Sequence, residues 1–161
     1  MPLETFYATA AQLFFTLLGF WWVVVQFKRD VWVRDTASRR MSYAVSLHFL
    51  LPGVMCVVAL LSEEVSFIWN APFVVAGLFG LFATLFAAYS APVRLRATQV
   101  SLFGHGAAIV LYALITAWAV YPGLLSALGF DVKPLLVEAI LLVLLAVLGA
   151  TLAWFLFMEP E

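Results

Sequence analysis

The sequence contains few charged residues. Lys, Arg, Asp and Glu account for 11% of its 161 residues, whereas soluble globular proteins contain about 25%. Hydrophobic residues make up 66% of the chain, and its mean hydropathy is +1.10. We therefore expect the lipid bilayer to surround most of the chain.

The sequence also lacks cysteine pairs and an excess of basic residues. The single cysteine, Cys56, excludes an intramolecular disulfide and a thiolate metal cluster within one chain. The formal net charge of −1 argues against a nucleic-acid partner. No nucleophile with its base, phosphate-binding glycine loop or metalloprotease helix is recognisable. We therefore expect neither an enzyme nor a metal site.

Long apolar runs dominate what remains. Runs of about 20 residues suit membrane-spanning helices rather than the shorter alternating segments of a barrel. The sequence therefore predicts an all-α polytopic membrane protein, in which residues 1–161 form a single transmembrane domain. Its five spans are expected at about residues 6–27, 42–61, 67–90, 97–121 and 135–158.

The distribution of basic residues predicts the orientation of this five-helix bundle. Cytoplasmic loops are enriched in Lys and Arg. Seven of the eight basic residues follow the first or third span, namely Lys28, Arg29, Arg34, Arg39, Arg40, Arg94 and Arg96. The connection after the second span has only the acids Glu63 and Glu64, and the one after the fourth has only Lys133 as a base. This predicts an N-terminus outside and a C-terminus in the cytoplasm.

Small and polar residues recur every three or four positions along the first span. They are Thr5, Ala8, Gln12, Thr16, Gly19, Val23 and Gln26, and this spacing places them on one helix face. Such a face is typical of helix packing in lipid. It would also suit the lining of a narrow water or ion path in an oligomer, with Thr5, Gln12, Thr16, Gly19 and Gln26 as pore-lining candidates.

The third and fifth spans have contrasting patterns. The third has small residues at intervals of four, Ala76, Gly80, Thr84 and Ala88, which indicates close helix contact. The fifth is almost wholly Leu, Val, Ala and Phe, so we expect it to be peripheral and to face lipid. Its Glu138, about one turn inside the span, is expected to be an interfacial acid stabilised by the helix N-terminus and Lys133.

Two histidines lie within spans, His48 in the second and His105 in the fourth. An ionisable residue in a span suggests a functional site. The pair could simply be neutral and hydrogen-bonded, could relay protons or sense pH, or could ligate a haem b. For the haem, the glycines beside His105 would admit the porphyrin. Pro52 is expected to kink the second span and to free the carbonyl of His48.

The residues Thr5-Phe6-Tyr7-Ala8-Thr9-Ala10-Ala11-Gln12, followed by Thr16-Leu17-Leu18-Gly19, resemble the first span of some small uncharacterised bacterial multi-pass membrane proteins. The resemblance covers about one span and implies a bacterial inner-membrane location, without an activity. The sequence as a whole favours a homo-oligomer with a channel-like or permeation role, lined by the polar face of the first span and requiring no cofactor. The alternatives are a haem b cytochrome ligated by His48 and His105, and a non-catalytic scaffold that binds a membrane-protein partner.

Overall fold

A computed structural model of the chain describes residues 2–62, 66–90, 99–123, 127, 129 and 132–158. All the regular structure in these residues is helical, which confirms the predicted all-α class. Five of the helices are long and apolar enough to cross a membrane. The helices are α1 (Leu3–Phe27), α2 (Arg29–Trp32), α3 (Thr36–Leu61), α4 (Ser66–Ser90), α6 (Gln99–Val120) and α8 (Pro134–Met158).

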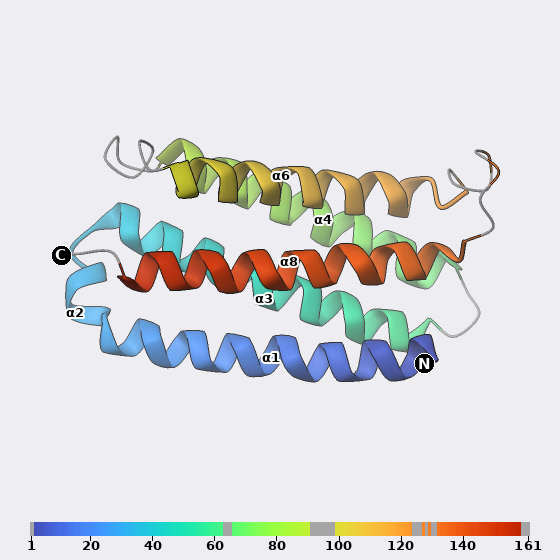
Figure 1. Ribbon diagram of the computed structural model, residues 1–161, viewed down its shortest axis with the longest axis horizontal. Coiled ribbons are helices and arrows are strands. Elements are labelled where there is room, and N and C mark those ends of the chain that lie inside the picture. Colours follow the sequence, from blue (N-terminus) through green and yellow to red (C-terminus); the bar gives the residue numbers. More distant parts are fainter. Residues whose placement is uncertain are drawn as a thin grey trace.

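The five long helices lie side by side along the long axis of the molecule, and the short α2 closes one end (Figure 1). Helix α3 packs against α1, α4 and α8, while α6 packs against α4 and α8, and α1 also contacts α8. The contact between α3 and α8 lies between two parts of one continuous buried core. We call them the α1–α3–α8 compartment and the α3–α4–α6–α8 compartment.

Helix α8 is only partly peripheral: much of it is exposed, as expected, but one of its faces is buried in the bundle. It contacts three other helices, and its Leu142 and Leu145 are fully buried. Leu, Val and Ala cover all sides of α8, so its sequence contains no polar face that would distinguish lipid from protein. Only the packing of the neighbouring helices shows which face is buried.

Glycines lie where the helices approach most closely. A Cβ atom added to Gly53 would lie 3.2 Å from the ring of Phe15 in α1, and one added to Gly149 would lie 3.0 Å from Cβ of His48 in α3. Small residues permit such approaches, which are the main source of helix association in lipid. Three further pairs have the same arrangement: Gly77 with Thr116, Gly80 with Tyr112, and Gly104 with Leu152.

The helix bounds lie within a few residues of the predicted spans, except at the start of α3. This helix begins at Thr36, before the predicted boundary at about residue 42. Asp35 explains the early start, since its carboxylate accepts a hydrogen bond of 2.9 Å from the backbone N–H of Ser38, as is typical of a residue that caps a helix N-terminus. The predicted acidic pair Glu63 and Glu64, together with Arg94 and Arg96, lies outside the described residues.

Three of the six tryptophans are core residues rather than the headgroup anchors that their positions near span ends suggest. Trp21, Trp32 and Trp69 are buried. The indole N–H of Trp21 donates to the carbonyl of Ser42 at 3.1 Å, and its ring lies 5.8 Å from that of Trp32. The short α2 thus turns Trp32 back onto the bundle and covers its end.

Candidate functional site

The polar face of α1 lies on the outside of the bundle. Its members Thr5, Gln12, Thr16, Gly19 and Gln26 are all exposed in the single chain. The hydroxyl of Thr16 donates to the carbonyl of Gln12 at 2.7 Å, so it is satisfied within the helix. The buried face of α1 consists of Tyr7, Ala10, Ala11, Phe14, Leu18 and Trp21. The predicted pore-lining residues can therefore line a path only if another molecule covers them.

Helix α4 packs against α6 as predicted, but only two of its four predicted packing residues are buried. Gly80 approaches Tyr112, and Thr84 is buried with its hydroxyl donating to the carbonyl of Gly80 at 2.8 Å. Ala76 and Ala88, by contrast, are only half-buried. The buried small residues follow the mixed spacing of three and four that a helix requires, rather than strict intervals of four.

His48 is buried in the α3–α4–α6–α8 compartment, with 2% of its surface exposed. The carbonyl of Ala44, one turn earlier, lies close to its ring, but neither ring nitrogen makes a hydrogen bond of normal geometry. Nearly all buried polar groups in proteins have such a partner. His48 is therefore an exception that calls for a functional explanation.

Aromatic and ionisable groups from α6 surround this imidazole. The ring of Tyr112 meets it edge to face, with centroids 5.6 Å apart, and the Tyr112 hydroxyl lies 3.4 Å from the carbonyl of Leu47. His105 is buried and close enough to interact electrostatically with His48. The structure thus brings together the two histidines that the sequence places in different spans, and it adds Tyr112.

The packing around the histidines leaves little space for a porphyrin. Tyr112 covers one side of the His48 ring, and Gly149 of α8 approaches its Cβ. Gly104 is expected to leave space beside His105. The side chain of Leu152 in α8 instead occupies the space next to Gly104. A haem between these histidines would require α6 and α8 to move apart.

Glu138 is the feature that sequence reasoning misplaced. It is fully buried, and neither carboxylate oxygen has a hydrogen-bond partner, which corrects the expectation of an interfacial acid. Tyr7 of α1 lies beside the same turn of α8, where its hydroxyl donates to the carbonyl of Leu135 at 2.6 Å. The sequence signal for this site was an acid inside a span, but its depth depends on how α1 and α3 cover the end of α8.

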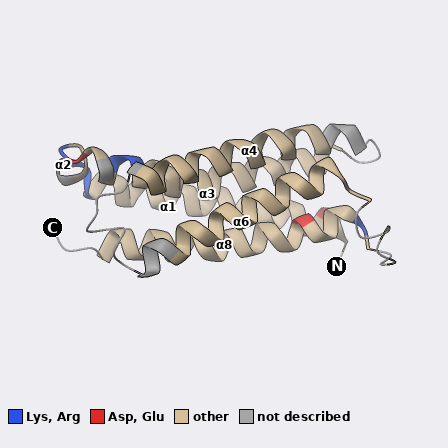
Figure 2. Ribbon diagram, turned by 90° about the horizontal axis from the view of Figure 1, so that it is seen from above, with Lys and Arg blue, Asp and Glu red and all other residues tan. Residues whose placement is uncertain are grey.

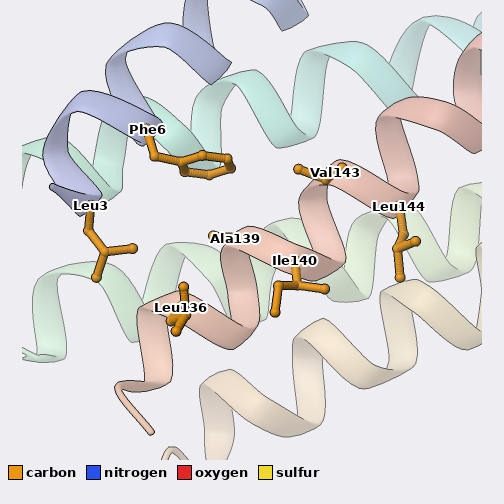
Figure 3. Close-up of a pocket in the computed structure, with 7 residues that line it drawn as sticks. All are labelled: Leu3, Phe6, Leu136, Ala139, Ile140, Val143 and Leu144. Carbon is orange, nitrogen blue, oxygen red and sulfur yellow. The ribbon is translucent and has the colours of Figure 1, made fainter. Parts of the chain in front are cut away.

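The outer surface of α8 has two apolar grooves. One, of about 380 Å³, lies between α8 and the start of α1 and is shown in Figure 3; it is lined by Leu3, Phe6, Leu136, Ala139, Ile140, Val143 and Leu144. The other, of about 630 Å³, lies between α6 and α8 and includes Val110 and Val147. Both have almost entirely carbon linings, so neither offers the polar groups that chemistry or ion binding needs.

The described basic residues gather at the end of the bundle that contains α2, whereas Lys133 lies at the opposite end (Figure 2). Arg40 lies over the ring of Phe86, 5.1 Å from its centroid, and Lys28 lies over that of Phe157 at 5.8 Å. These contacts hold the charges against the helix ends. The Lys and Arg residues in the described part of the chain therefore lie at the two ends of the bundle.

Comparison of the chain with known protein families, curated proteins and solved structures found no match.

Proposed function

We propose that this chain is a multi-pass protein of a bacterial inner membrane, inserted with its α2 end in the cytoplasm. Five apolar helices of sufficient length support insertion. The gathering of Lys and Arg at the α2 end supports the orientation, because positive charge is enriched in cytoplasmic loops. The bacterial location rests on the resemblance of the first span.

Cysteine labelling in intact cells tests this orientation. With a membrane-impermeant maleimide, we expect Lys133→Cys to be labelled and Val33→Cys to be labelled only after the membrane is opened. Both side chains are exposed in the chain, so a difference reports the side of the membrane. The natural Cys56 is buried and provides the unreactive background. The reverse labelling pattern would contradict the proposed orientation.

We propose further that the protein mediates proton permeation through its interior, with His48 and His105 on the path. One observation carries this proposal: the imidazole of His48 is buried beside His105 and Tyr112, and neither of its ring nitrogens makes a hydrogen bond of normal geometry, although the Ala44 carbonyl lies close to the ring. Imidazole accepts and releases protons near neutral pH in water. Ionisable groups inside membrane bundles typically mark ion and proton pathways.

A flux assay separates this role from the alternatives. In liposomes containing a pH-sensitive dye, a potassium gradient with valinomycin should drive proton entry at a rate above that of empty vesicles. We expect His48→Gln to abolish the flux, because the amide cannot carry a proton between partners. Thr151→Val is the matched control, since Thr151 is exposed and its hydroxyl donates to the carbonyl of Val147 in the same helix at 2.8 Å. Unaltered flux in His48→Gln would contradict the interior path.

The polar face of α1 supports a second candidate, a path between the copies of a homo-oligomer. Gln12 exposes an amide near the middle of α1, where lipid offers no hydrogen-bond partner. If this face lines the path, Gln12→Leu should remove the flux and His48→Gln should preserve it.

If the protein is instead a scaffold, the wild type will conduct protons no better than empty vesicles, and no variant will change the flux. A Soret band lost in His105→Ala would identify the haem alternative.

A further inference from the structure

The α1–α3–α8 compartment contains the second buried ionisable group, Glu138. Its surface is 0% exposed, and both oxygens lack hydrogen-bond partners. A buried carboxylate without partners is costly, whereas the neutral acid carries no charge and can donate one hydrogen bond. A small positive charge bound at the carboxyl group would remove the cost of burying the carboxylate.

The neighbours of Glu138 suit a proton better than a metal ion. Tyr7 faces it from α1, and Cys56 of α3 lies close to Tyr7. Helices α6 and α8 run antiparallel, and Gly104 of α6 contacts Leu152 of α8. Trp118 and Glu138 are the same number of residues away from this contact along their helices, so they lie at the same level of the bundle. Trp118 does not titrate. In the described part of the chain, no group of three or more His, Cys, Asp or Glu residues could hold a metal.

Tyr7 is placed to act on this carboxyl group. Its hydroxyl hydrogen is committed to the carbonyl of Leu135, one turn before Glu138, so its oxygen lone pairs are left to accept a bond. An acid that donates to this oxygen would extend a chain from Glu138 through Tyr7 to the backbone of α8. Such chains are the usual way in which a buried polar group is satisfied.

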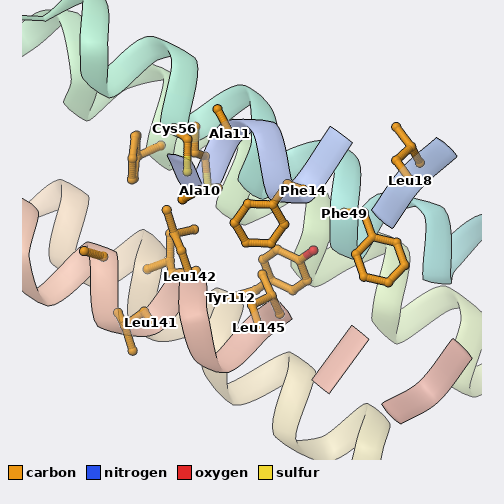
Figure 4. Close-up of a cluster of buried hydrophobic side chains, with 14 of the residues drawn as sticks. Ala10, Ala11, Phe14, Leu18, Phe49, Cys56, Tyr112, Leu141, Leu142 and Leu145 are labelled. Carbon is orange, nitrogen blue, oxygen red and sulfur yellow. The ribbon is translucent and has the colours of Figure 1, made fainter. Parts of the chain in front are cut away.

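We propose that Glu138 and Tyr7 form a reversible proton-binding site, separate from the histidines. Gly149 of α8 lies against His48, and the rise of an α-helix places Glu138 about 16 Å away along the axis. Phe14, Tyr112 and Leu145 lie in the middle of the buried cluster, between Cys56 and Phe49 (Figure 4). Proton binding at Glu138 therefore does not depend on the flux proposed for the histidine pair.

A hydrophobic carbodiimide tests the site on the full-length protein in liposomes. The acid gives its proton to a carbodiimide nitrogen while its oxygen bonds to the central carbon, and the adduct rearranges to a stable N-acylurea with no leaving group. With dicyclohexylcarbodiimide we expect one adduct per chain by mass spectrometry, mapped to Glu138 and lost as the pH rises. Glu138→Gln should lose the adduct, and Tyr7→Phe should shift the pH at which labelling falls. Protection by Na⁺ at constant pH would overturn the proposal in favour of a metal cation.

Infrared difference spectra of wild type against Glu138→Gln provide a measurement that does not depend on reagent access. We expect the C=O stretch of a protonated acid to be replaced by the carboxylate stretch as pH increases. A carboxylate band at every pH, or an acid band at every pH, would overturn reversible binding. Exposed Glu4 at the same end of α1 is the matched control, because Glu4→Gln should leave the buried-acid signal intact. Loss of flux in His48→Gln with an intact Glu138 signal would distinguish the two proposals.

Discussion

Leu145→Ala should destabilise the protein by about 2–5 kcal/mol, the range measured for large-to-small substitutions in well-packed cores. Leu145 is 0% exposed and belongs to the same buried cluster as Phe14 and Tyr112 (Figure 4). Three different helices supply these side chains, so none can move into the space without separating from its own neighbours. The cavity therefore remains largely open.

Thermal unfolding in mild detergent, followed by circular dichroism, measures this loss as a fall in Tm. Val147→Ala is the matched control, because it lies on the same helix with 61% of its surface exposed. It removes methyl groups from the face toward lipid or detergent, where no cavity forms, and its Tm should stay close to that of wild type. Equal losses in the two variants would contradict the burial of the Leu145 face of α8.

Gly80→Ala should also destabilise the bundle, by about 1–3 kcal/mol, the usual cost of overpacking. The added methyl group would overlap the ring of Tyr112, which is itself fully buried and also meets the ring of His48 edge to face. The ring has no free direction in which to move, so α4 and α6 must separate. In a lipid environment close packing supplies much of the helix association, which makes this separation costly.

Gly19→Ala is the control for this substitution. Nothing lies within 4 Å of a Cβ added at Gly19, and alanine favours a helix over glycine by about 1 kcal/mol. We therefore expect an unchanged or higher Tm for Gly19→Ala and a lower Tm for Gly80→Ala in the same detergent. A similar change in both variants would contradict the close approach of α4 and α6.

The candidate sites show where pattern reasoning succeeds. His48 and His105 were recognised from sequence because an ionisable residue in an apolar run stands out whatever surrounds it. Their positions, six and eight residues inside the predicted span starts at about residues 42 and 97, are consistent with their proximity in space. The role of Tyr112 was not predictable, since tyrosine is common in such helices and only the contact between α3 and α6 brings its ring to His48.

The polar face of α1 and Glu138 show what a pattern along one helix leaves undecided. Small and polar residues on one face resemble a packing stripe, yet the structure packs the opposite face, with Phe14 and Tyr7 inside and Gln12 outside. Position along the span likewise suggests an interfacial Glu138, whereas the structure buries it close to Tyr7 of α1. In both cases the sequence describes one helix, and burial depends on its neighbours.

The scarcity of charge and the length of the apolar runs were enough to determine an all-helical chain with five helices able to cross a membrane, because local composition alone decides whether a backbone must satisfy its hydrogen bonds internally. The tertiary structure alone decided which faces meet. It placed one face of α8 against α1, α3 and α6, Gln12 on the outside of the bundle, and His48 and Glu138 in different parts of the core. Helices with apolar residues on every side contain no local signal for their partners, and only the fit of particular surfaces, such as Gly80 against Tyr112, selects one arrangement.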